Sequence, residues 1–308
     1  MSGYTRHTFW QDRPREDLGF FGPDSPTWKV WTSPAALIAF QRSIVVETFD
    51  PFLAAAVDQQ NGVREDPRGR MDGTLAYFTI VAIGDSRSAI EASRQLMGVH
   101  AKAVGVEPHS GKRFNANNPE SQLWIHITGW HSVLLCYEKY GPGKLGPEEE
   151  QRYWADCAIA AELQTCDPER VPRNRKELCQ YYESVRDKLH LSAESNDLID
   201  RFLNPEFTKG ILWPAGKSIS VATIATIPRW MRELGGFDQS RVLDLAVRLP
   251  AKALVRALTP RRARLRAARY LAPSVGPIWN WALWGDPPLR AETTTPALAK
   301  ERLAAHAS

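Results

Sequence analysis

One histidine, His100, lies on the apolar side of a predicted amphipathic helix over residues 87–104. Apolar residues recur around it at helical rather than strand spacing, at Ile90, Met97, Ala101 and Val104. An imidazole in such surroundings is disfavoured as a charged group and needs a partner for each of its nitrogens. Two interpretations follow: a core histidine bonded to a carbonyl, or an axial ligand to a metal or a haem iron.

A second set of side chains lies on an earlier helix that Pro67 is predicted to open. Arg70, Thr74 and Phe78 fall on one face of this helix, because residues four apart are neighbours on a helix surface. Gly73 in the helix interior costs about 1 kcal/mol relative to alanine. We therefore expect another group to approach the backbone at this point.

A second histidine with apolar neighbours, His126, lies on a helix predicted to begin after Asn118. Asn118 is a favourable N-cap, and the proline and glutamate that follow it suit the first helical turn. The residues around His126 on this helix are Leu123, Trp130, Val133 and Leu134. His131 falls on a different side and is predicted to be a polar-surface or capping residue.

The sequence lacks the common motifs of several enzyme classes. The chain has no C-x-x-C pair, no G-x-S-x-G, no H-E-x-x-H and no Glu-x-x-His, and its four cysteines are expected to be free, buried thiols. The PAGKS stretch at Pro214–Ser218 fails the P-loop spacing and follows no predicted strand. A haem iron needs as few as one protein imidazole, whereas its propionates favour arginine. A non-haem metal would need a third ligand, commonly a carboxylate.

The elements that must position these residues are predicted to be helices throughout. Neither an internal repeat nor a βαβ alternation is present, so the expected fold is all-α, with a single large multi-helix domain. We divide the chain into an irregular, proline- and aromatic-rich arm over 1–34, the helical domain over 35–290, and a frayed tail over 291–308. Within the domain, 106–117 is expected to be a loop, and residues 220–235 a helix kinked at Pro228.

The composition is that of an ordinary soluble globular protein, with 43% hydrophobic and 24% charged residues and a formal net charge of +4. The amino-terminal residues lack the apolar core of a signal peptide, and no apolar run approaches a bilayer span, so we expect a cytoplasmic protein. Arginines are dense from Arg256 to Arg269. They predict a solvated face or peripheral membrane contact, and nucleic-acid binding is not expected because no supporting motif is present.

Three stretches resemble one oxygenase family. DPRGRMDGTLAYF, MGVHAKAVG and FNANNPESQLWIHITGWHSVL follow, in order and spacing, the pattern of the family that includes the mycophenolic-acid-pathway (MpaB-type) oxygenase and the catalytic domain of rubber oxygenase, or latex clearing protein. The resemblance covers about residues 25–260. It implies an all-α fold that encloses a b-type haem.

By motif position, His100 falls on the proximal iron ligand of the rubber-oxygenase branch, and Arg70 and Thr74 fall on its distal arginine and threonine. A lysine that can take the sixth position in that branch corresponds to Gly73, so the distal side is expected to be more open. His126 is typical of the wider family, as a polar pocket residue or a rival axial ligand.

The resulting hypothesis is a haem b-dependent oxygenase that uses dioxygen on a hydrophobic organic substrate, with attack at a carbon–carbon double bond. The expected catalytic residues are Arg70, Thr74 and His126. The expected cofactor-binding residues are His100, which binds the iron, with Arg70, His126, Met97 and Val104. The alternatives are a non-catalytic haem carrier, a membrane-surface adaptor that uses Arg256–Arg269, and a haem peroxidase.

Overall fold

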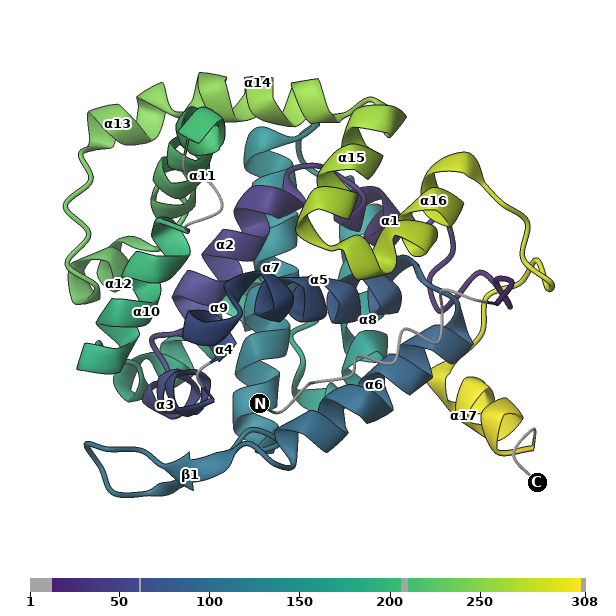
Figure 1. The fold of residues 1–308 in the computed structure, drawn as a ribbon, viewed down its shortest axis with the longest axis horizontal. Helices are drawn as coiled ribbons and strands as arrows, with labels where there is room; N and C mark the ends of the chain where they lie inside the picture. Colours follow the sequence, from purple (N-terminus) through teal and green to yellow (C-terminus); the bar gives the residue numbers. More distant parts are fainter. Residues whose placement is uncertain (1–12, 61, 206–209, 306–308) are drawn as a thin grey trace.

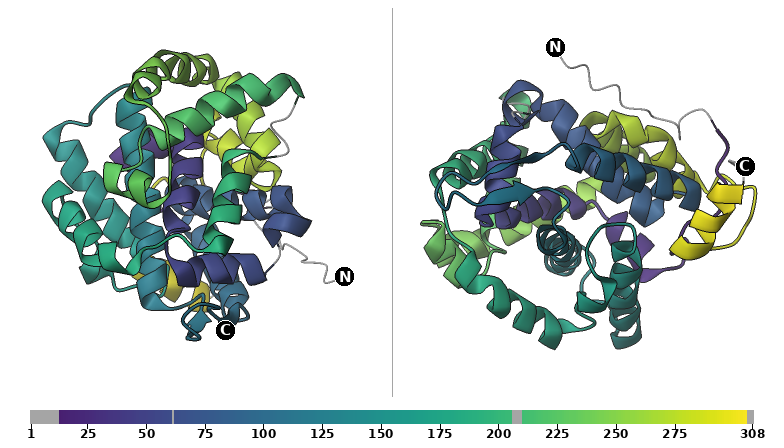
Figure 2. Two further views of the ribbon diagram at one scale, coloured as in Figure 1. Left: turned by 90° about the vertical axis from the view of Figure 1, so that its left-hand side faces the viewer. Right: turned by 90° about the horizontal axis from the view of Figure 1, so that it is seen from below.

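The longest helix, α7 (Pro119–Tyr140, 22 residues), stands at the centre of the computed structural model (Figure 1). The structure describes residues 13–60, 62–205 and 210–305. α2 (Ala36–Glu47) packs along α7 more extensively than any other pair of described elements, and α1 (Pro26–Trp31), α8 (Pro147–Ala161) and α14 (Arg248–Leu258) also contact α7. The two views in Figure 2 show the other helices surrounding this central pair.

The helices beside the predicted site are α3 (Pro51–Gln59), α4 (Gly62–Glu65), α5 (Pro67–Ile83) and α6 (Ser86–His100). Later in the chain come α9 (Arg175–Val185), α10 (Ala193–Leu203), α11 (Trp213–Ile224), α12 (Arg229–Leu234), α13 (Arg241–Ala246), α15 (Arg261–Leu271), α16 (Gly276–Trp284) and α17 (Pro296–Ala305). The described strands, β1 (Val104–Val106) and β2 (Arg113–Asn115), form one antiparallel hairpin. The expected all-α class is therefore confirmed.

Local sequence signals determine where the central helices begin. The side chain of Asn118 accepts a hydrogen bond from the backbone N–H of Glu120 at 2.9 Å, with Pro119 in the first turn of α7. Asp66 caps α5 in the same way, and Asp85 caps α6 by accepting from the N–H of Ser88 at 2.7 Å. Each cap satisfies a backbone donor that has no partner within its helix. These caps explain why the predicted starts of α5 and α7 are confirmed.

The helix that carries His100 is shorter than predicted. α6 ends at His100, and Val104 lies instead at the start of β1 with 46% of its surface exposed. The expected loop over 106–117 belongs largely to the β1–β2 hairpin. A side chain at Gly105 would collide with the ring of Phe114, and Gly111 adopts a positive φ of 67° in the turn, so glycine permits this close pairing.

The two ends of the chain are more ordered than predicted. The expected irregular arm contains α1, whose Trp28 and Trp31 are buried in the core. The expected frayed tail contains α17, which packs on α6, because Ala299 is buried there and Leu303 contacts the core. The amide of Leu18 also donates to the carbonyl of Glu292 at 2.9 Å, which ties the two ends together. Residues 1–12 and 306–308 lie outside the described residues.

The predicted kink at Pro228 is a complete break between α11 and α12, since a proline there cannot continue the backbone ladder of α11. Three of the four cysteines are free and buried as expected, whereas Cys179 is exposed. No helix in the described part of the chain combines the length and apolar character needed to cross a membrane.

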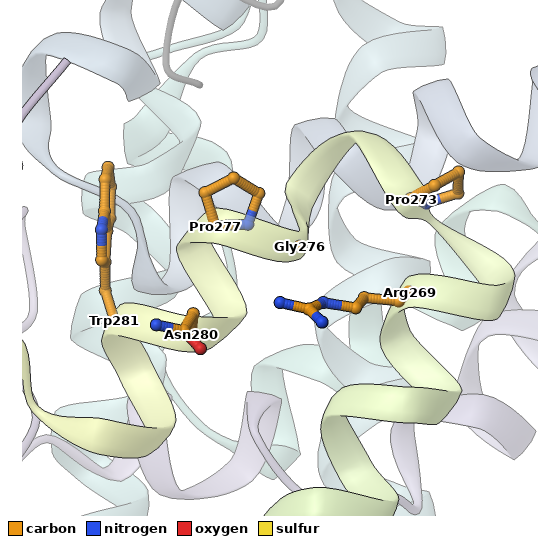
Figure 3. A pocket seen from close by; sticks show the side chains of 6 residues that line it. All are labelled: Arg269, Pro273, Gly276, Pro277, Asn280 and Trp281. Atoms are coloured by element: carbon orange, nitrogen blue, oxygen red, sulfur yellow. The ribbon is translucent and has the colours of Figure 1, made fainter. Parts of the chain in front are cut away.

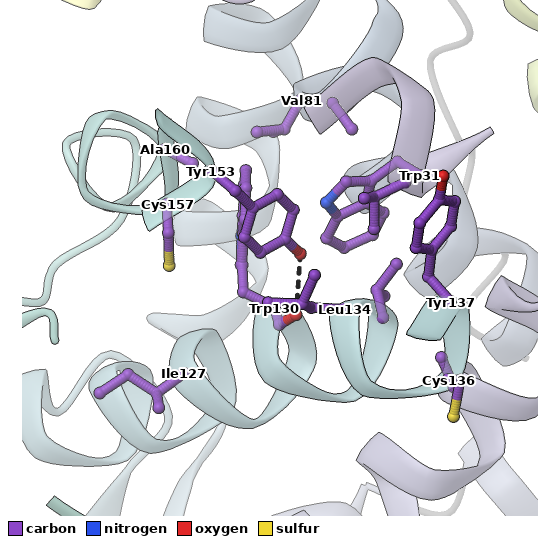
Figure 4. Packing of buried hydrophobic residues seen from close by; sticks show 14 of the residues in the cluster. Trp31, Val81, Ile127, Trp130, Leu134, Cys136, Tyr137, Tyr153, Cys157 and Ala160 are labelled. Carbon is purple, nitrogen blue, oxygen red and sulfur yellow. Dashed lines mark hydrogen bonds between the residues drawn. The ribbon is translucent and has the colours of Figure 1, made fainter. Parts of the chain in front are cut away.

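Aromatic side chains fill the space between α1, α7 and α8 (Figure 4). The ring of Trp130 lies 5.2 Å from that of Tyr153 and 5.3 Å from that of Trp31, centroid to centroid. The hydroxyl of Tyr153 donates to the carbonyl oxygen of Trp130 at 2.8 Å. The hydroxyl of Tyr153 is satisfied in this way, whereas Nε1 of Trp31 is buried without a hydrogen-bond partner among the described residues, and the packed rings support α7.

Candidate active site

A carboxylate occupies the interior where α2, α5 and α7 meet. Glu47, at the end of α2, accepts a hydrogen bond from the hydroxyl of Ser43, one turn earlier. The hydroxyl of Thr128 on α7 donates to the same oxygen, Oε1, at 3.1 Å. A side chain at Gly129 would touch both Ser43 and the ring of Phe78 on α5. The polar atoms of this cluster therefore come from α2 and α7, the ring of Phe78 on α5 lies beside it, and Glu47 itself is half-buried.

Burial raises the pKa of Glu47 from an ordinary 4.5 to about 7. The hydrogen bonds from Ser43 and Thr128 and the positive charge of Arg70 act in the opposite direction and lower it. Desolvation is the largest effect, and it outweighs the two hydroxyl donors and the positive charge of Arg70. Glu47 can therefore gain or lose a proton near neutral pH, which is the property required of a general acid or base.

The predicted face of α5 is confirmed as one continuous helical face. Arg70 lies near its exposed end, Thr74 is half-buried one turn on, and Phe78 reaches the core, where its ring stacks on Trp31 at 5.8 Å. The hydroxyl of Thr74 donates to the carbonyl of Arg70 at 3.0 Å. The face thus runs from a cation at the surface to an aromatic ring inside.

His100 is half-buried at the last position of α6. Its Nδ1 lies 3.3 Å from Nε2 of Gln122 on α7, and the same amide donates to the carbonyl of Ala116 at 2.6 Å. Within the described part of the chain, this is the ring's single hydrogen bond. Because the amide nitrogen of Gln122 can only donate, Nδ1 is the acceptor, and Nε2, which carries the proton of the neutral ring in this arrangement, has no hydrogen-bond partner among the described residues.

Burial, together with the nearby charge of Arg70, lowers the pKa of His100 to about 4. The imidazole is consequently neutral at pH 7 and keeps a nitrogen lone pair, as a metal ligand must. Arg70 lowers the pKa of both His100 and Glu47, so its guanidinium lies within electrostatic range of both groups. Arg70 therefore acts electrostatically on both Glu47 and His100, while Thr74 bonds to the backbone of Arg70 on α5.

The structure places His126 differently. His126 is buried in the aromatic core, where its Nε2 donates to the carbonyl of Cys157 on α8 at 2.7 Å and its ring lies against Trp130. Its Nδ1 has no hydrogen-bond partner within the described residues. His126 and Thr128 are two residues apart on α7 and so face opposite sides. The structure thus does not bring His126 next to Glu47.

Met97 and Val104, the remaining predicted cofactor contacts, lie on either side of His100. The carbonyl of Met97 accepts from Nδ2 of Asn117 at 2.9 Å, and its side chain is half-buried. Val104 lies beyond the end of α6, on the edge of the hairpin. Only Met97 therefore shares the helix of His100.

The sequence analysis missed Glu47, Ser43, Thr128 and Gln122. A signal for Glu47 is nevertheless present: it is the only acidic residue of α2, and it lies in the last turn, where the helix dipole disfavours a negative charge. Its serine partner is four residues earlier, which is the spacing of facing side chains. The partners on α7 carried no comparable signal, because hydroxyl and amide side chains are common on any helix.

Among the residues that the structure describes, no group of three His, Cys, Asp or Glu side chains is arranged to hold a metal ion. A cofactor that brings its own ligands needs only His100. A separate pocket of about 540 Å³ lies between α15 and α16, where Arg269 and Trp281 border it (Figure 3). It shares no residue with the Glu47 cluster and contains no acid–base pair.

In the described part of the chain, the fold is helical apart from one hairpin, and its ionisable cluster centres on Glu47. Residues 28–260 match the family described as ER-bound oxygenase mpaB/B′/Rubber oxygenase, catalytic domain, and the chain belongs to this family. The match covers most of the chain and includes every residue of the Glu47 cluster. No curated protein and no solved structure matches the chain with significance. Membership indicates an oxygenase that acts on a small molecule with oxygen.

Proposed function

We propose that the protein is a haem b-dependent oxygenase that uses dioxygen to cleave a carbon–carbon double bond in a hydrophobic substrate. The observation that carries this proposal is the state of His100: a neutral imidazole with one nitrogen held by Gln122 and the other uncommitted, beside Arg70. A porphyrin supplies four nitrogen ligands, so a single histidine is sufficient. Membership of an oxygenase family supports the reaction class.

The residues present fit a haem. His100 would bind the iron through Nε2 in the form that carries its proton on Nδ1, and Gln122 would then turn its amide oxygen towards that N–H, which is the accepting role of the outer partners of metal-bound histidines. Arg70 supplies a cation for a propionate or for negative charge that develops during the reaction. Haem b, when bound, supplies iron for the activation of dioxygen. Half-buried apolar side chains, among them Phe78 and Leu96, suit a hydrophobic substrate.

We assign the transfer of a proton to the carboxyl group of Glu47. Its carboxyl group is about half ionised at pH 7, so it can hold a proton on one oxygen or accept one from the substrate there. Ser43 and Thr128 orient the carboxyl group by donating to Oε1. Thr74 is adjacent to Arg70 on α5 and would line the same space. A catalytic or cofactor-binding role of His126 stays a prediction, and its bond to the carbonyl of Cys157 favours a structural role in the aromatic core.

The overall reaction balances without an external reductant. Both atoms of one dioxygen are incorporated, the carbon–carbon double bond and the oxygen–oxygen bond are broken, and two carbonyl groups form. The olefin carbons are oxidised and the dioxygen is reduced. A haem peroxidase would instead need peroxide, and a haem carrier would consume no oxygen.

Haem reconstitution tests this function. The purified protein with added haem should show a Soret band, and the ferrous form should consume oxygen when a polyisoprenoid is supplied. His100→Ala should lose both properties. The matched control is His109→Ala, since His109 lies on the exposed hairpin and contacts Glu194. A colourless wild type, or an unchanged Soret band in His100→Ala, would refute the proposal.

Two further expectations concern location. Peripheral membrane contact through Arg256–Arg269 and a cytoplasmic location both stay predictions. Neither is needed for the oxygenase chemistry, because the proposed site lies among α2, α5, α6 and α7.

A further inference from the structure

The carboxy-terminal quarter of the chain carries a concentrated positive charge. Residues 241–284 contain nine of the chain's 39 Lys and Arg residues and one of its 35 Asp and Glu residues. This segment therefore has a formal charge of +8, whereas the rest of the chain sums to −4. Such an asymmetry within one chain indicates a surface that meets an anionic partner.

The same segment exposes large aliphatic side chains on α13 and α14. Leu249 is 78% exposed, Val242 76% and Leu245 54%, and they recur at the three- and four-residue spacing of one helical stripe. α13 and α14 are separated only by Val247, which keeps a helical backbone, so the stripe is nearly continuous. Both helices lie along one outer edge of the molecule (Figure 1).

The opposite face of α14 explains why these side chains are not needed for folding. Val247, Ala251 and Val255 recur every four residues and are buried. They face α7 and α11, the helices that α14 contacts. The helix is thus held by one apolar face while a second apolar stripe points outward, and monomeric proteins rarely expose such stripes without use.

Long cationic side chains flank the outward stripe. Arg241, Arg248, Lys252 and Arg256 are all exposed on α13 and α14. The only acid in the segment, Asp244, pairs with Arg232 at 2.6 Å and accepts from the amide of Gln239 at 2.7 Å. Its charge is therefore neutralised locally and does not offset the flanking cations.

We propose that the outer face of α13–α14 binds the surface of an anionic phospholipid bilayer. Val242, Leu245 and Leu249 enter the boundary between headgroups and acyl chains, while Arg248 and Lys252 contact lipid phosphates. Aliphatic side chains flanked by cations on a surface helix match the interfacial mode of membrane binding. An acidic protein could also pair with these cations. It would not explain why the two most exposed positions of the segment, Leu249 and Val242, carry aliphatic side chains.

The proposed membrane-binding surface on α13–α14 precedes α15, the helix with the densest arginines. In α15, Arg264 is partly buried, with its pKa lowered by desolvation, and its Nη2 donates to the carbonyl of Thr259 at 2.7 Å. Exposed arginines of α15, such as Arg262, add to the field without an aliphatic stripe of comparable exposure. The proposal is independent of haem, since none of these residues belongs to the Glu47 cluster.

Co-sedimentation with lipid vesicles tests the proposal. The full-length protein should bind vesicles of phosphatidylcholine mixed with phosphatidylglycerol far more strongly than vesicles of phosphatidylcholine alone, and binding should weaken as salt increases. Leu249→Asp should weaken partitioning about tenfold, and the pair Arg248→Glu with Lys252→Glu by at least about tenfold, on the scale of membrane-surface charges.

Matched controls come from equally exposed positions elsewhere. Leu289 is 71% exposed outside α13–α14, and Leu289→Asp should leave vesicle binding unchanged. Arg94 is exposed on α6, and Arg94→Glu changes the net charge by about −2, as Arg248→Glu or Lys252→Glu alone does, so it is the control for each single reversal. Thermal unfolding verifies that every variant is folded. The proposal is overturned if the wild type ignores anionic vesicles, or if Leu289→Asp and Arg94→Glu weaken binding as much as the α14 variants do.

Discussion

Two buried histidines that look alike in the sequence lie in very different surroundings. His126 is 1% exposed in the aromatic core and donates to a backbone carbonyl, as an ordinary core histidine does. His100 is half-buried beside Arg70, with one nitrogen held by Gln122. In both rings the pKa is about 4, chiefly because of burial, so the pKa does not distinguish them. The contrast shows that the partners of a histidine, and not its burial, indicate its role.

Removing the imidazole of His100 and that of His126 in separate variants tests this contrast most strongly. His100→Ala should abolish the Soret band and oxygen consumption, because it removes the only imidazole proposed to bind iron. His126→Leu should keep both and lose stability by about 2 kcal/mol, because the carbonyl of Cys157 loses its buried donor. Absorption spectra and urea unfolding of the two variants measure these effects. The assignment of His100 fails if His126→Leu is the colourless variant.

The Glu47 cluster is expected to give the next largest effect on activity. Glu47→Gln should lower the rate by about 10²- to 10⁴-fold, the usual contribution of general acid–base catalysis. If the ionised form accepts the proton, the wild-type rate should rise as pH increases through about 7. The variant should show no such rise. A pH–rate profile of oxygen consumption separates this role from a structural one.

Glu47 also makes a stability prediction with a defined sign. Because its folded pKa of about 7 exceeds the ordinary 4.5, folding favours the protonated carboxyl group. The contribution to stability is present below pH 4.5 and is lost as pH rises to about 7, by an amount on the order of 3 kcal/mol. The free energy of unfolding of Glu47→Gln minus that of the wild type should therefore be larger at pH 8 than at pH 4.5, as measured by urea unfolding.

The smallest effect in the series concerns Gln122. The amide nitrogen of Gln122 faces Nδ1 and also donates to Ala116, whereas an iron-bound His100 would need the amide oxygen there to accept from its Nδ1 proton. Gln122→Leu should weaken haem affinity about 10- to 100-fold, as the loss of such outer partners does, without abolishing the Soret band at saturating haem. Haem titration measures the change. Unaltered affinity would show that His100 is oriented by other contacts.

The sequence determined the helical class, the starts of α5 and α7 and the shared face of Arg70, Thr74 and Phe78, because caps and helical spacing act over a few residues. It also indicated His100 through its apolar neighbours. The end of α6 was wrong by several residues, since the hairpin that stops it depends on Gly105 meeting Phe114. The ordered arm and α17 were missed, because their stability comes from packing on distant helices.

Only the tertiary structure could place Glu47 beside Arg70 and separate His100 from His126. The carboxyl group, the hydroxyl of Thr128 and the guanidinium come from three helices that are distant along the chain, and no periodicity within one helix reports which others it will meet. The same holds for α13–α14: its two apolar faces are equivalent in the sequence, and packing on α7 and α11 decided which one remains exposed. Local propensity fixes the helices, whereas long-range packing fixes their partners.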